Sequence, residues 1–524
     1  MNAHDTLAMP SVAATPAALS AATRNSLRVL AAAALLGGLG DVLLRATPWG
    51  LNLTLWTLAL VAAAVILRRG AELGTAGRAW IPLALGATAL MTWRDSPTLK
   101  ALDLTALCVV LLLAMHRARG GRVRDAGVLT YLLALGSAAV EAASGLATLA
   151  MGDVRWGEVG RGRGGRYALP LARGLALAIP LVWVFTALLM AADAKFAGVV
   201  ERGFQLDAGA VMGHALIAGV VALVAAGVLR ALALGDEPAA RPAPRSGPKP
   251  FLGIVETATA LGMLNVLFLA FVVVQLPYLF GGSSAAGTVG YADYAKRGFF
   301  ELVTVAGLVL PLLLGFHHAL RRDQPRSECV FRWLAGGQVA LLFVIIVSAL
   351  HRMRLYQNAY GLTELRLYTT AFMLWLAIVF AWFCATVLRG RREGFAFGSL
   401  LIAADVLILL HVINPDARIV STNAARPRAE APFDVRYAAR LSADAVGPLV
   451  AALPATARED RCVVAARLER RWGADAPADW RSWSVARSRA RRVVRARADA
   501  LGAGCPAVIP AEWHSLDRRI SQPG

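Results

Sequence analysis

The sequence predicts an all-α fold: a polytopic transmembrane helical bundle of about 11–12 spans, followed by a small α-helical C-terminal domain. Of the 524 residues, 57% are hydrophobic and only 17% are charged, against about 25% charged residues in a typical soluble domain. The mean hydropathy is +0.56. Apolar runs of about twenty residues, the length that a helix needs to cross a bilayer, recur along the chain. This composition excludes a single-domain soluble enzyme and a disordered chain.

The apolar segments define the predicted elements in order. They lie at 26–44, 51–67, 79–93, 99–115, 127–150, 171–192, 210–234, 252–275, 299–319, 333–350, 369–388 and 396–413. The stretch 235–251 is rich in Pro and Arg, which favour neither a helix nor a core, so we expect it to link an N-terminal membrane half, 26–234, to a C-terminal half, 252–413. Residues 1–25 are predicted to be a flexible tail, and residues 414–524 a soluble helical domain.

The distribution of basic residues predicts the orientation in the membrane. If all twelve segments cross, the two sides carry similar numbers of basic residues. If segment 127–150 does not cross, one side becomes far richer, and the positive-inside rule makes that side cytoplasmic. This segment is rich in Ala, Gly and Ser and contains Glu141, which favours an interfacial or re-entrant helix. We therefore favour eleven spans, with the N-terminus in the cytoplasm and the C-terminal domain outside.

Two of the five cysteines lie in the C-terminal domain. An extracytoplasmic compartment favours disulfides, so Cys462 and Cys505 are candidates for a bridge; two unrelated cysteines are the alternative. The cysteines have no CxxC spacing and no His partner, so no metal and no cofactor are expected. The formal net charge of +20 would indicate nucleic-acid binding in a soluble protein. In a membrane protein it is typical of cytoplasmic loops, so the lipid bilayer is the expected partner and no nucleic acid is expected.

Several stretches differ from generic membrane spans. Among them are WRDSPTLKALDLTAL at 93–107, QLPYLFGG at 275–282, RMRLYQNAYGLTELRLYTTAFMLW at 352–375 and INPDARIVSTNAAR at 413–426. In this order they resemble the bacterial membrane proteins grouped as domain of unknown function 4173, over roughly residues 26–450. The resemblance implies a polytopic protein of the bacterial inner membrane and brings no catalytic residues.

The predicted external loops combine Tyr, Arg and carboxylate side chains. The candidate residues are Arg94, Asp95, Asp193, Tyr294, Arg297, Arg352, Arg354, Tyr356, Glu364, Arg366 and Asp416. One interpretation is a set of paired charges that binds a small ligand or a protein partner, or that docks the C-terminal domain. The other is that Tyr belongs to the membrane interface while Arg and Asp satisfy helix ends.

Ionisable residues inside the hydrocarbon layer are costly and are therefore functional candidates. The candidates are Asp405, near the middle of its segment, Glu256, and Asp41, which has Arg45 one turn later. A proton-coupled secondary transporter would use such carboxylates, whereas structural pairing would only fix the helix register. A glycosyltransferase acting on lipid-linked sugars would need a sizeable loop after Asp41, and the loop there is short.

The C-terminal domain is expected to contain short helices around a small core. The candidate core residues are Val463, Ala466, Trp472, Trp480 and Trp483. The sequence has no Walker, GxSxG or HExxH motif. It therefore favours a non-enzymatic sensor or scaffold that acts through its external loops and its C-terminal domain, with the proton-coupled transporter as the alternative.

Overall fold

The structure is a computed structural model that describes most of the chain. It describes residues 19–68, 78–124, 126–159, 208–234, 251–280, 299–321, 325–427, 433–476, 478–506 and 510, together with the single positions 182, 185, 189 and 190. The predicted tail 1–25, segment 171–192 and the linker 235–251 fall wholly or mostly outside these residues. Within them the secondary structure is helical, and the only β contact is an isolated bridge between Leu252 and Leu320. The all-α polytopic architecture is thus confirmed.

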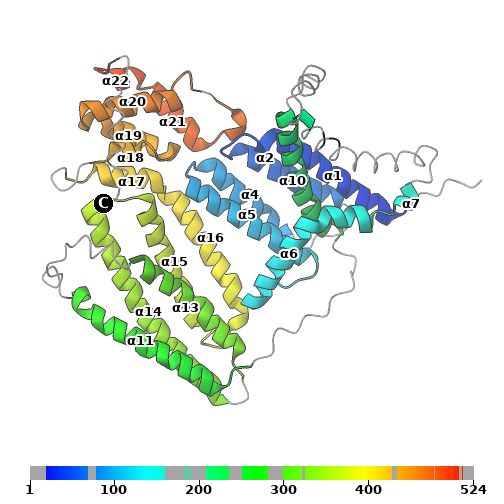
Figure 1. Ribbon diagram of the computed structural model, residues 1–524, viewed down its shortest axis with the longest axis vertical. Coiled ribbons are helices and arrows are strands. Elements are labelled where there is room, and N and C mark those ends of the chain that lie inside the picture. The colour runs from blue at the N-terminus through cyan, green and yellow to red at the C-terminus, as the bar shows by residue number, and fades with distance from the viewer. Residues whose placement is uncertain are drawn as a thin grey trace, which may run out of the picture.

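The helices form two membrane halves and a C-terminal domain (Figure 1). The N-terminal half contains α1 (Ala21–Leu44), α2 (Leu51–Leu67), α4 (Trp80–Trp93), α5 (Pro97–Ala118), α6 (Val128–Thr148), the short α7 (Trp156–Val159) and α10 (Ala208–Leu234). The C-terminal half contains α11 (Ile254–Phe280), α13 (Phe299–Ala319), α14 (Pro325–Tyr360), α15 (Glu364–Thr386) and α16 (Phe395–Ile413). Nine helical segments among the described residues are long and apolar enough to cross a membrane, and α2 and α4 are shorter apolar helices.

Each half has its own buried core. One apolar cluster joins residues from α1, α2, α4, α5, α6 and α10, with Leu60, Met115 and Leu229 fully buried. A second cluster joins α11, α13, α14, α15 and α16 around Phe380 and Phe383. The halves meet where α5 and α6 contact α16.

In the N-terminal half, small residues bring α1 into close contact with α10. A Cβ atom built on Gly37 would lie 2.6 Å from the Ala218 carbonyl oxygen and 2.6 Å from the Ala222 Cβ, and one built on Gly40 would lie 2.5 Å from Val221 Cγ1. Lipid chains are as apolar as leucine, so membrane helices associate through close packing of small residues rather than through the hydrophobic effect. The glycines of α1 therefore allow the backbones of α1 and α10 to touch.

The beginning of α1 and the C-terminal domain lie at opposite ends of the bundle. At the start of α1, the Ser20 Oγ donates to Glu158 Oε2 at 2.6 Å. At its other end, the Val42 carbonyl accepts a hydrogen bond from Arg481 of the C-terminal domain at 2.7 Å.

Helix α6 lies along the end of the bundle that is remote from the C-terminal domain. Near its beginning, the Tyr131 hydroxyl donates to the Val123 carbonyl just after α5, and in its second half Glu141 forms an ion pair with Arg119. After its end, Asp153 accepts from Arg230 in the last turns of α10 at 2.6 Å. Its length and composition suit a membrane span, but both of its ends contact residues on one side of the bundle. These contacts support the interpretation of segment 127–150 as an interfacial or re-entrant helix.

The C-terminal domain begins at a sharp turn. Asn414 adopts a left-handed conformation, with φ of 55°, between α16 and α17 (Pro415–Ala424). The following helices are α18 (Val435–Ala438), η4 (Ala443–Ala445), α19 (Val446–Ala452), η5 (Leu453–Ala455), α20 (Arg458–Trp472), η6 (Trp480–Ser482), α21 (Val485–Arg495) and α22 (Ala498–Gly502). They enclose a third apolar cluster that includes Leu449, Leu468 and Val494.

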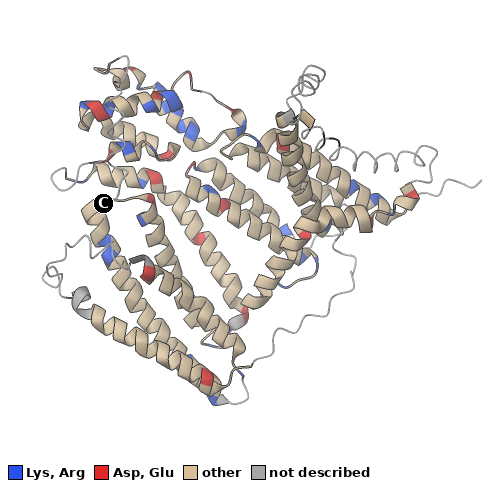
Figure 2. Ribbon diagram, viewed as in Figure 1, with Lys and Arg blue, Asp and Glu red and all other residues tan. Residues whose placement is uncertain are grey.

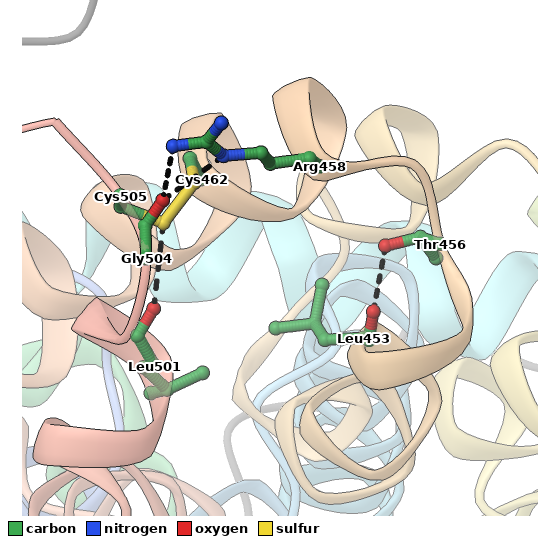
Figure 3. The surroundings of a disulfide bond; sticks show 7 residues. All are labelled: Leu453, Thr456, Arg458, Cys462, Leu501, Gly504 and Cys505. Carbon is green, nitrogen blue, oxygen red and sulfur yellow. Dashed lines mark hydrogen bonds between the residues drawn. A yellow bond between two sulfur atoms is a disulfide. The ribbon is translucent and has the colours of Figure 1, made fainter.

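The predicted pairing of Cys462 with Cys505 is present in the structure. The two sulfur atoms are 1.98 Å apart, and the bridge joins α20 to the chain after α22 (Figure 3). Beside it, Arg458 Nη2 donates to the Gly504 carbonyl at 2.8 Å. The bridge therefore fastens the last described helix to the core of the domain.

The predicted core of this domain is partly wrong. Trp472 is buried, but the buried positions of α20 next to the expected Val463 and Ala466 are Val464 and Ala465. The side chains of Trp480 and Trp483 are 61% and 42% exposed. Their backbone contacts the membrane half instead, because the Trp483 carbonyl accepts from Leu51 N at the start of α2 at 3.0 Å. Exposed tryptophans at the end of a span suit the membrane interface.

We predict that Gly37→Ala destabilises the protein by about 1–3 kcal/mol, because the added methyl group has no room against α10. The matched control is Gly38→Ala, where a Cβ meets nothing within 4 Å and a better helix former is expected to be neutral or stabilising by up to about 1 kcal/mol. Thermal unfolding of the purified proteins in detergent measures both changes. Equal shifts for the two variants would contradict the close contact.

Candidate functional site

The candidate site is a buried set of charged side chains where the two membrane halves and the C-terminal domain meet. We call it the ionic junction. Its members are Arg94, Asp95, Lys100, Asp103, His411, Asp444 and Arg487. Figure 2 shows that charged residues are sparse along most helices of the bundle and that basic residues are frequent in the C-terminal domain.

A short link between α4 and α5 positions the first two members. Helix α4 ends at Trp93, Arg94 is extended, and Pro97 occupies the first turn of α5, where its missing N–H costs nothing. The link is therefore too short to leave the end of the bundle, and it holds Arg94 and Asp95 against the C-terminal domain.

Asp95 is 5% exposed and has partners from two parts of the chain. Its Oδ1 accepts from Lys100 Nζ at 2.6 Å and from Arg487 Nε, on α21, at 2.9 Å. Its backbone N–H donates to Asp444 Oδ2 at 2.7 Å. A single residue of the link is thus bonded both to the bundle and to the C-terminal domain.

Arg94 joins all three parts. Its Nε donates to the His411 carbonyl oxygen at the end of α16 at 2.8 Å, and its Nη1 lies 3.1 Å from Asp444 Oδ1. The guanidinium carbon also lies 4.5 Å from the ring centroid of Trp93, a cation–π geometry. Arg94 therefore connects the N-terminal half to the C-terminal half and to the C-terminal domain.

Asp444 lies in the 3-10 helix η4, which Ser442 caps by accepting from the Asp444 N–H. Its side chain is 3% exposed. Burial raises the pKa of the Asp444 carboxyl, and the hydrogen bond from the Asp95 N–H and the charge of Arg94 oppose that rise. A buried carboxylate without partners is strongly destabilising, so these contacts are required where Asp444 is ionised.

His411 and Asp103 form a second pair inside the bundle. His411 Nε2 lies 3.2 Å from Asp103 Oδ2, and both side chains are fully buried. The Trp93 ring stacks on the His411 ring with their centroids 6.2 Å apart. The pair joins α5 to α16, two of the helices through which the two halves meet.

Asp416 lies in the first turn of α17, beside the junction, and is fully buried. Its Oδ2 accepts from the Ser442 N–H at 3.2 Å, while its Oδ1 has no hydrogen-bond partner within the described residues. Burial raises the pKa of the Asp416 carboxyl to about 6, and the charges of Glu364 and Asp444 act in the same direction.

The structure places the candidate residues of the predicted external loops at the end of the bundle that carries the C-terminal domain, as far as it describes them. Arg94 and Asp95 belong to the junction, and Asp416 lies beside it. Asp193, Tyr294 and Arg297 lie outside the described residues.

Three of these residues lie in one long helix rather than in a loop. Arg352, Arg354 and Tyr356 belong to α14, whose 36 residues span about 54 Å, well beyond a hydrocarbon layer of about 30 Å. The helix continues because nothing in its sequence stops it before Gly361, which has φ of +78°. Arg352 is buried and donates to Gln275, whereas Arg354 is exposed.

The beginning of α15 makes a second contact with the C-terminal domain. The backbone N–H of Glu364 donates to the Tyr437 hydroxyl at 3.0 Å. Asn423 of α17 exchanges two hydrogen bonds with the backbone of Leu362, at 2.7 and 2.8 Å. Arg366 lies over the Tyr356 ring, 4.0 Å from its centroid. These contacts dock the domain rather than form an open ligand site.

The three predicted intramembrane carboxylates do not come together. Asp405 is exposed on α16, Glu256 is exposed in the first turn of α11, and Asp41 lies near the end of α1. Asp41 pairs with Arg45 at 3.3 Å, as predicted, and also with His214 Nδ1 at 2.5 Å.

The sequence pattern favoured Asp405, whereas the structure buries Asp103 and His411. Asp103 lies in the distinctive stretch 93–107, one helical turn after Lys100, while His411 lies outside the distinctive stretches. Asp444 and Arg487 had no local signal, because a charged residue in a polar domain is ordinary. Within the described part of the chain, no group of three or more His, Cys, Asp or Glu side chains has a geometry that suits a metal ion.

Comparison with known proteins identifies a family. A family model described as Domain of unknown function (DUF4153) matches residues 80–452, which include every member of the junction except Arg487. The expectation of an uncharacterised family is confirmed, whereas the specific family 4173 is not. No curated protein and no solved structure matches the chain.

We predict that Asp444→Ala weakens the docking of the C-terminal domain by about 3–5 kcal/mol, because Arg94 is left buried without its carboxylate. The matched control is Glu328→Ala, which removes an ion pair with Arg332 whose side chains are 42% and 46% exposed and is expected to cost less than about 1 kcal/mol. The rate of limited proteolysis of the C-terminal domain in the full-length protein measures both. Equal protection of the two variants would show that the pair does not hold the domain.

We also predict that docking weakens as the pH rises through about 6. The pKa of Asp416 is raised in the folded protein from 3.8 to about 6, so its contribution is fully present below pH 3.8 and is lost as the pH approaches and passes 6. The shift corresponds to about 3 kcal/mol between the folded and unfolded states, and docking depends on the part of it that comes from burial against the bundle. The same proteolysis assay at pH 5 and pH 7.5 measures it, and Asp416→Asn is expected to remove this part of the dependence. An unchanged pH profile in that variant would assign the dependence to other groups.

Proposed function

We propose, from the premise that the chain belongs to the DUF4153 family, that this integral membrane protein is a non-enzymatic sensor or scaffold in which the C-terminal domain follows the arrangement of the membrane bundle. The ionic junction is the observation that supports the proposal. Arg94 contacts both the end of α16 and Asp444 of the C-terminal domain. A movement of one membrane half against the other therefore displaces a side chain to which the domain is bonded.

The energetics of the junction suit a coupling role. Buried ion pairs add little stability over an apolar contact of the same size, but they are intolerant of a lost partner. Asp95 has one cation from the bundle and one from α21, so separating the domain from the bundle leaves a buried charge with fewer partners. Docking is therefore expected to change in one step rather than gradually.

The orientation that we propose places the C-terminal domain outside the cytoplasm of a bacterial inner membrane and the N-terminus inside. Basic residues lie beyond the ends of α2, α5, α13 and α15 that face away from the C-terminal domain, and the positive-inside rule makes that side cytoplasmic. The disulfide between Cys462 and Cys505 supports the same orientation, because disulfides persist outside the cytoplasm. A protein partner or a small ligand would then bind at the external side.

The alternative is a proton-coupled transporter that uses Asp405 and Glu256, and the positions of these two residues give it less support. Such a carrier needs carboxylates near the middle of the membrane that face a shared path. Asp405 and Glu256 are exposed, on helices of the same half, and Glu256 lies at a helix end.

Genetic complementation separates the two functions. Deleting the gene in the source organism and measuring the transcripts that change defines a response, which the wild-type gene restores. Because docking carries the signal in our proposal, Asp444→Ala is expected to lose the response, while Asp405→Asn and Glu256→Gln keep it. Immunoblots of the membrane fraction control for abundance.

The opposite pattern would reject the proposal. A carrier is expected to lose its function with Asp405→Asn at normal abundance and to tolerate a loosened C-terminal domain. Restoration of the full response by Asp444→Ala, at wild-type abundance and with the domain shown by proteolysis to be undocked, would likewise exclude the sensor or scaffold that we propose.

A further inference from the structure

The contact between Asp103 and His411 has a feature that a structural ion pair does not need. Both side chains are fully buried, and the carboxylate Oδ1 of Asp103 has no hydrogen-bond partner within the described part of the chain. Buried polar atoms normally have partners, so each exception calls for an explanation.

The hydrogen bonds of His411 fix where its protons are. Its Nδ1 lies 2.9 Å from the Leu407 carbonyl oxygen, and a carbonyl oxygen only accepts, so Nδ1 carries a hydrogen. In a neutral ring Nε2 then has a lone pair, which points at Asp103 Oδ2 at 3.2 Å. Two lone pairs repel, so this contact requires a proton between the two atoms. The proton belongs either to an imidazolium or to a carboxylic acid, and in both cases the pair holds one exchangeable proton.

The elements around the pair carry both signs of charge. The titratable and charged groups on them are Arg94 from the α4–α5 link, Lys100 from α5, Tyr368 from α15, Asp416 from α17, Asp95 beside Arg94, Asp444 from η4 and Arg487 from α21. Lys100, one turn before Asp103, already has Asp95 as its partner. The cations Arg94, Lys100 and Arg487 only equal in number the acids Asp95, Asp444 and Asp416, so no surplus cation remains for a negative charge on Asp103. Loss of the proton therefore leaves a buried charge without a cation of its own.

The pair is connected to the C-terminal domain by two successive hydrogen bonds. The backbone carbonyl of His411 accepts from Arg94 Nε at 2.8 Å, and Arg94 Nη1 lies 3.1 Å from Asp444. A displacement of His411 on loss of the proton acts directly on Arg94. His411 lies in the last turn of α16, one of the helices that join the two halves, so the proton lies at the contact between them.

We propose that Asp103 and His411 form a proton-binding site at the seam of the two membrane halves, and that a bound proton keeps the C-terminal domain docked. The proton-binding part stands on the geometry alone, whereas the control of docking rests on the proposed function. Loss of the proton leaves a carboxylate facing an imidazole lone pair. The repulsion between them separates α5 from α16 and loosens the hydrogen bonds of Arg94.

The central variant is Asp103→Asn. The amide of asparagine has nearly the shape of the carboxyl group and can donate an N–H to His411 Nε2 at any pH, so it imitates the protonated pair. Asp416→Asn is included in every protein that is compared, so that Asp416 does not contribute to the measured pH dependence. The full-length chain is reconstituted in lipid nanodiscs.

Docking is measured as a distance between two spin labels. Labels on Glu469 of α20 and Leu365 of α15, both exposed, report on the domain and the bundle after Cys108, Cys329 and Cys384 are replaced by serine. If undocking releases one proton, the undocked fraction is expected to rise up to tenfold per pH unit in the protein with Asp103. It is expected to stay constant with Asp103→Asn. The same pH profile in both proteins would overturn the proposal.

Proton binding is measured separately by ¹⁵N NMR of histidine-labelled protein, in which His411→Gln identifies the His411 signals among the eight histidines. We expect the Nε2 shift of His411 to titrate with Asp103 and not with Asp103→Asn. A shift that is constant with pH when Asp103 is present would refute the proton site itself. A titration that leaves the label distance unchanged would refute its control of docking, while the complementation experiment independently decides the proposed function.

Discussion

The removal of Asp95 and Asp444 from water is the constraint on which the arrangement of this protein depends. A carboxylate in a buried position must find cations or hydrogen-bond donors, or it loses its charge. Asp95 obtains them from Lys100 of α5 and Arg487 of α21, and Asp444 obtains them from Arg94 and the Asp95 backbone. Arg487 lies 392 residues from Asp95, and Asp444 lies 350 residues from Arg94, so the burial of two carboxylates fixes how the bundle and the C-terminal domain sit on each other.

The apolar parts of the molecule are organised by other forces. Inside the membrane, close packing replaces the hydrophobic effect, and the glycines of α1 let it touch α10. In the C-terminal domain a conventional apolar core and the Cys462–Cys505 disulfide hold short helices together. The contact between bundle and domain combines both kinds of interaction, because Leu362 and Leu367 of the bundle pack against the apolar cluster of the domain beside the ionic junction. The charged part of this contact responds to protons and charges more than the apolar part does.

Much of the fold followed from local patterns. Long apolar segments predicted the bounds of most helices within about five residues, although α14 extends well beyond the predicted segment 333–350 at both ends. Arg94, Asp95 and Asp416 were selected because their loops contained charges that a simple connection does not need. The prediction was poorer where a residue type had two uses. Trp480 and Trp483 were assigned to a core but are exposed, since tryptophan suits a membrane interface as well. Arg352 and Tyr356 were assigned to a loop, because the hydropathy of α14 falls before its helix ends.

The sequence by itself determined that this chain crosses a membrane many times and carries a separate C-terminal domain, because the thickness of the hydrocarbon layer acts on each segment independently of the others. Only the tertiary structure decided that Asp103, rather than Asp405, faces a histidine. The partners in that pair are 308 residues apart, and those in the contact of Asp95 with Arg487 are 392 residues apart. Whether a carboxylate in a helix faces lipid or another helix depends on the rotation of that helix against its neighbours, and no local pattern of residues specifies it.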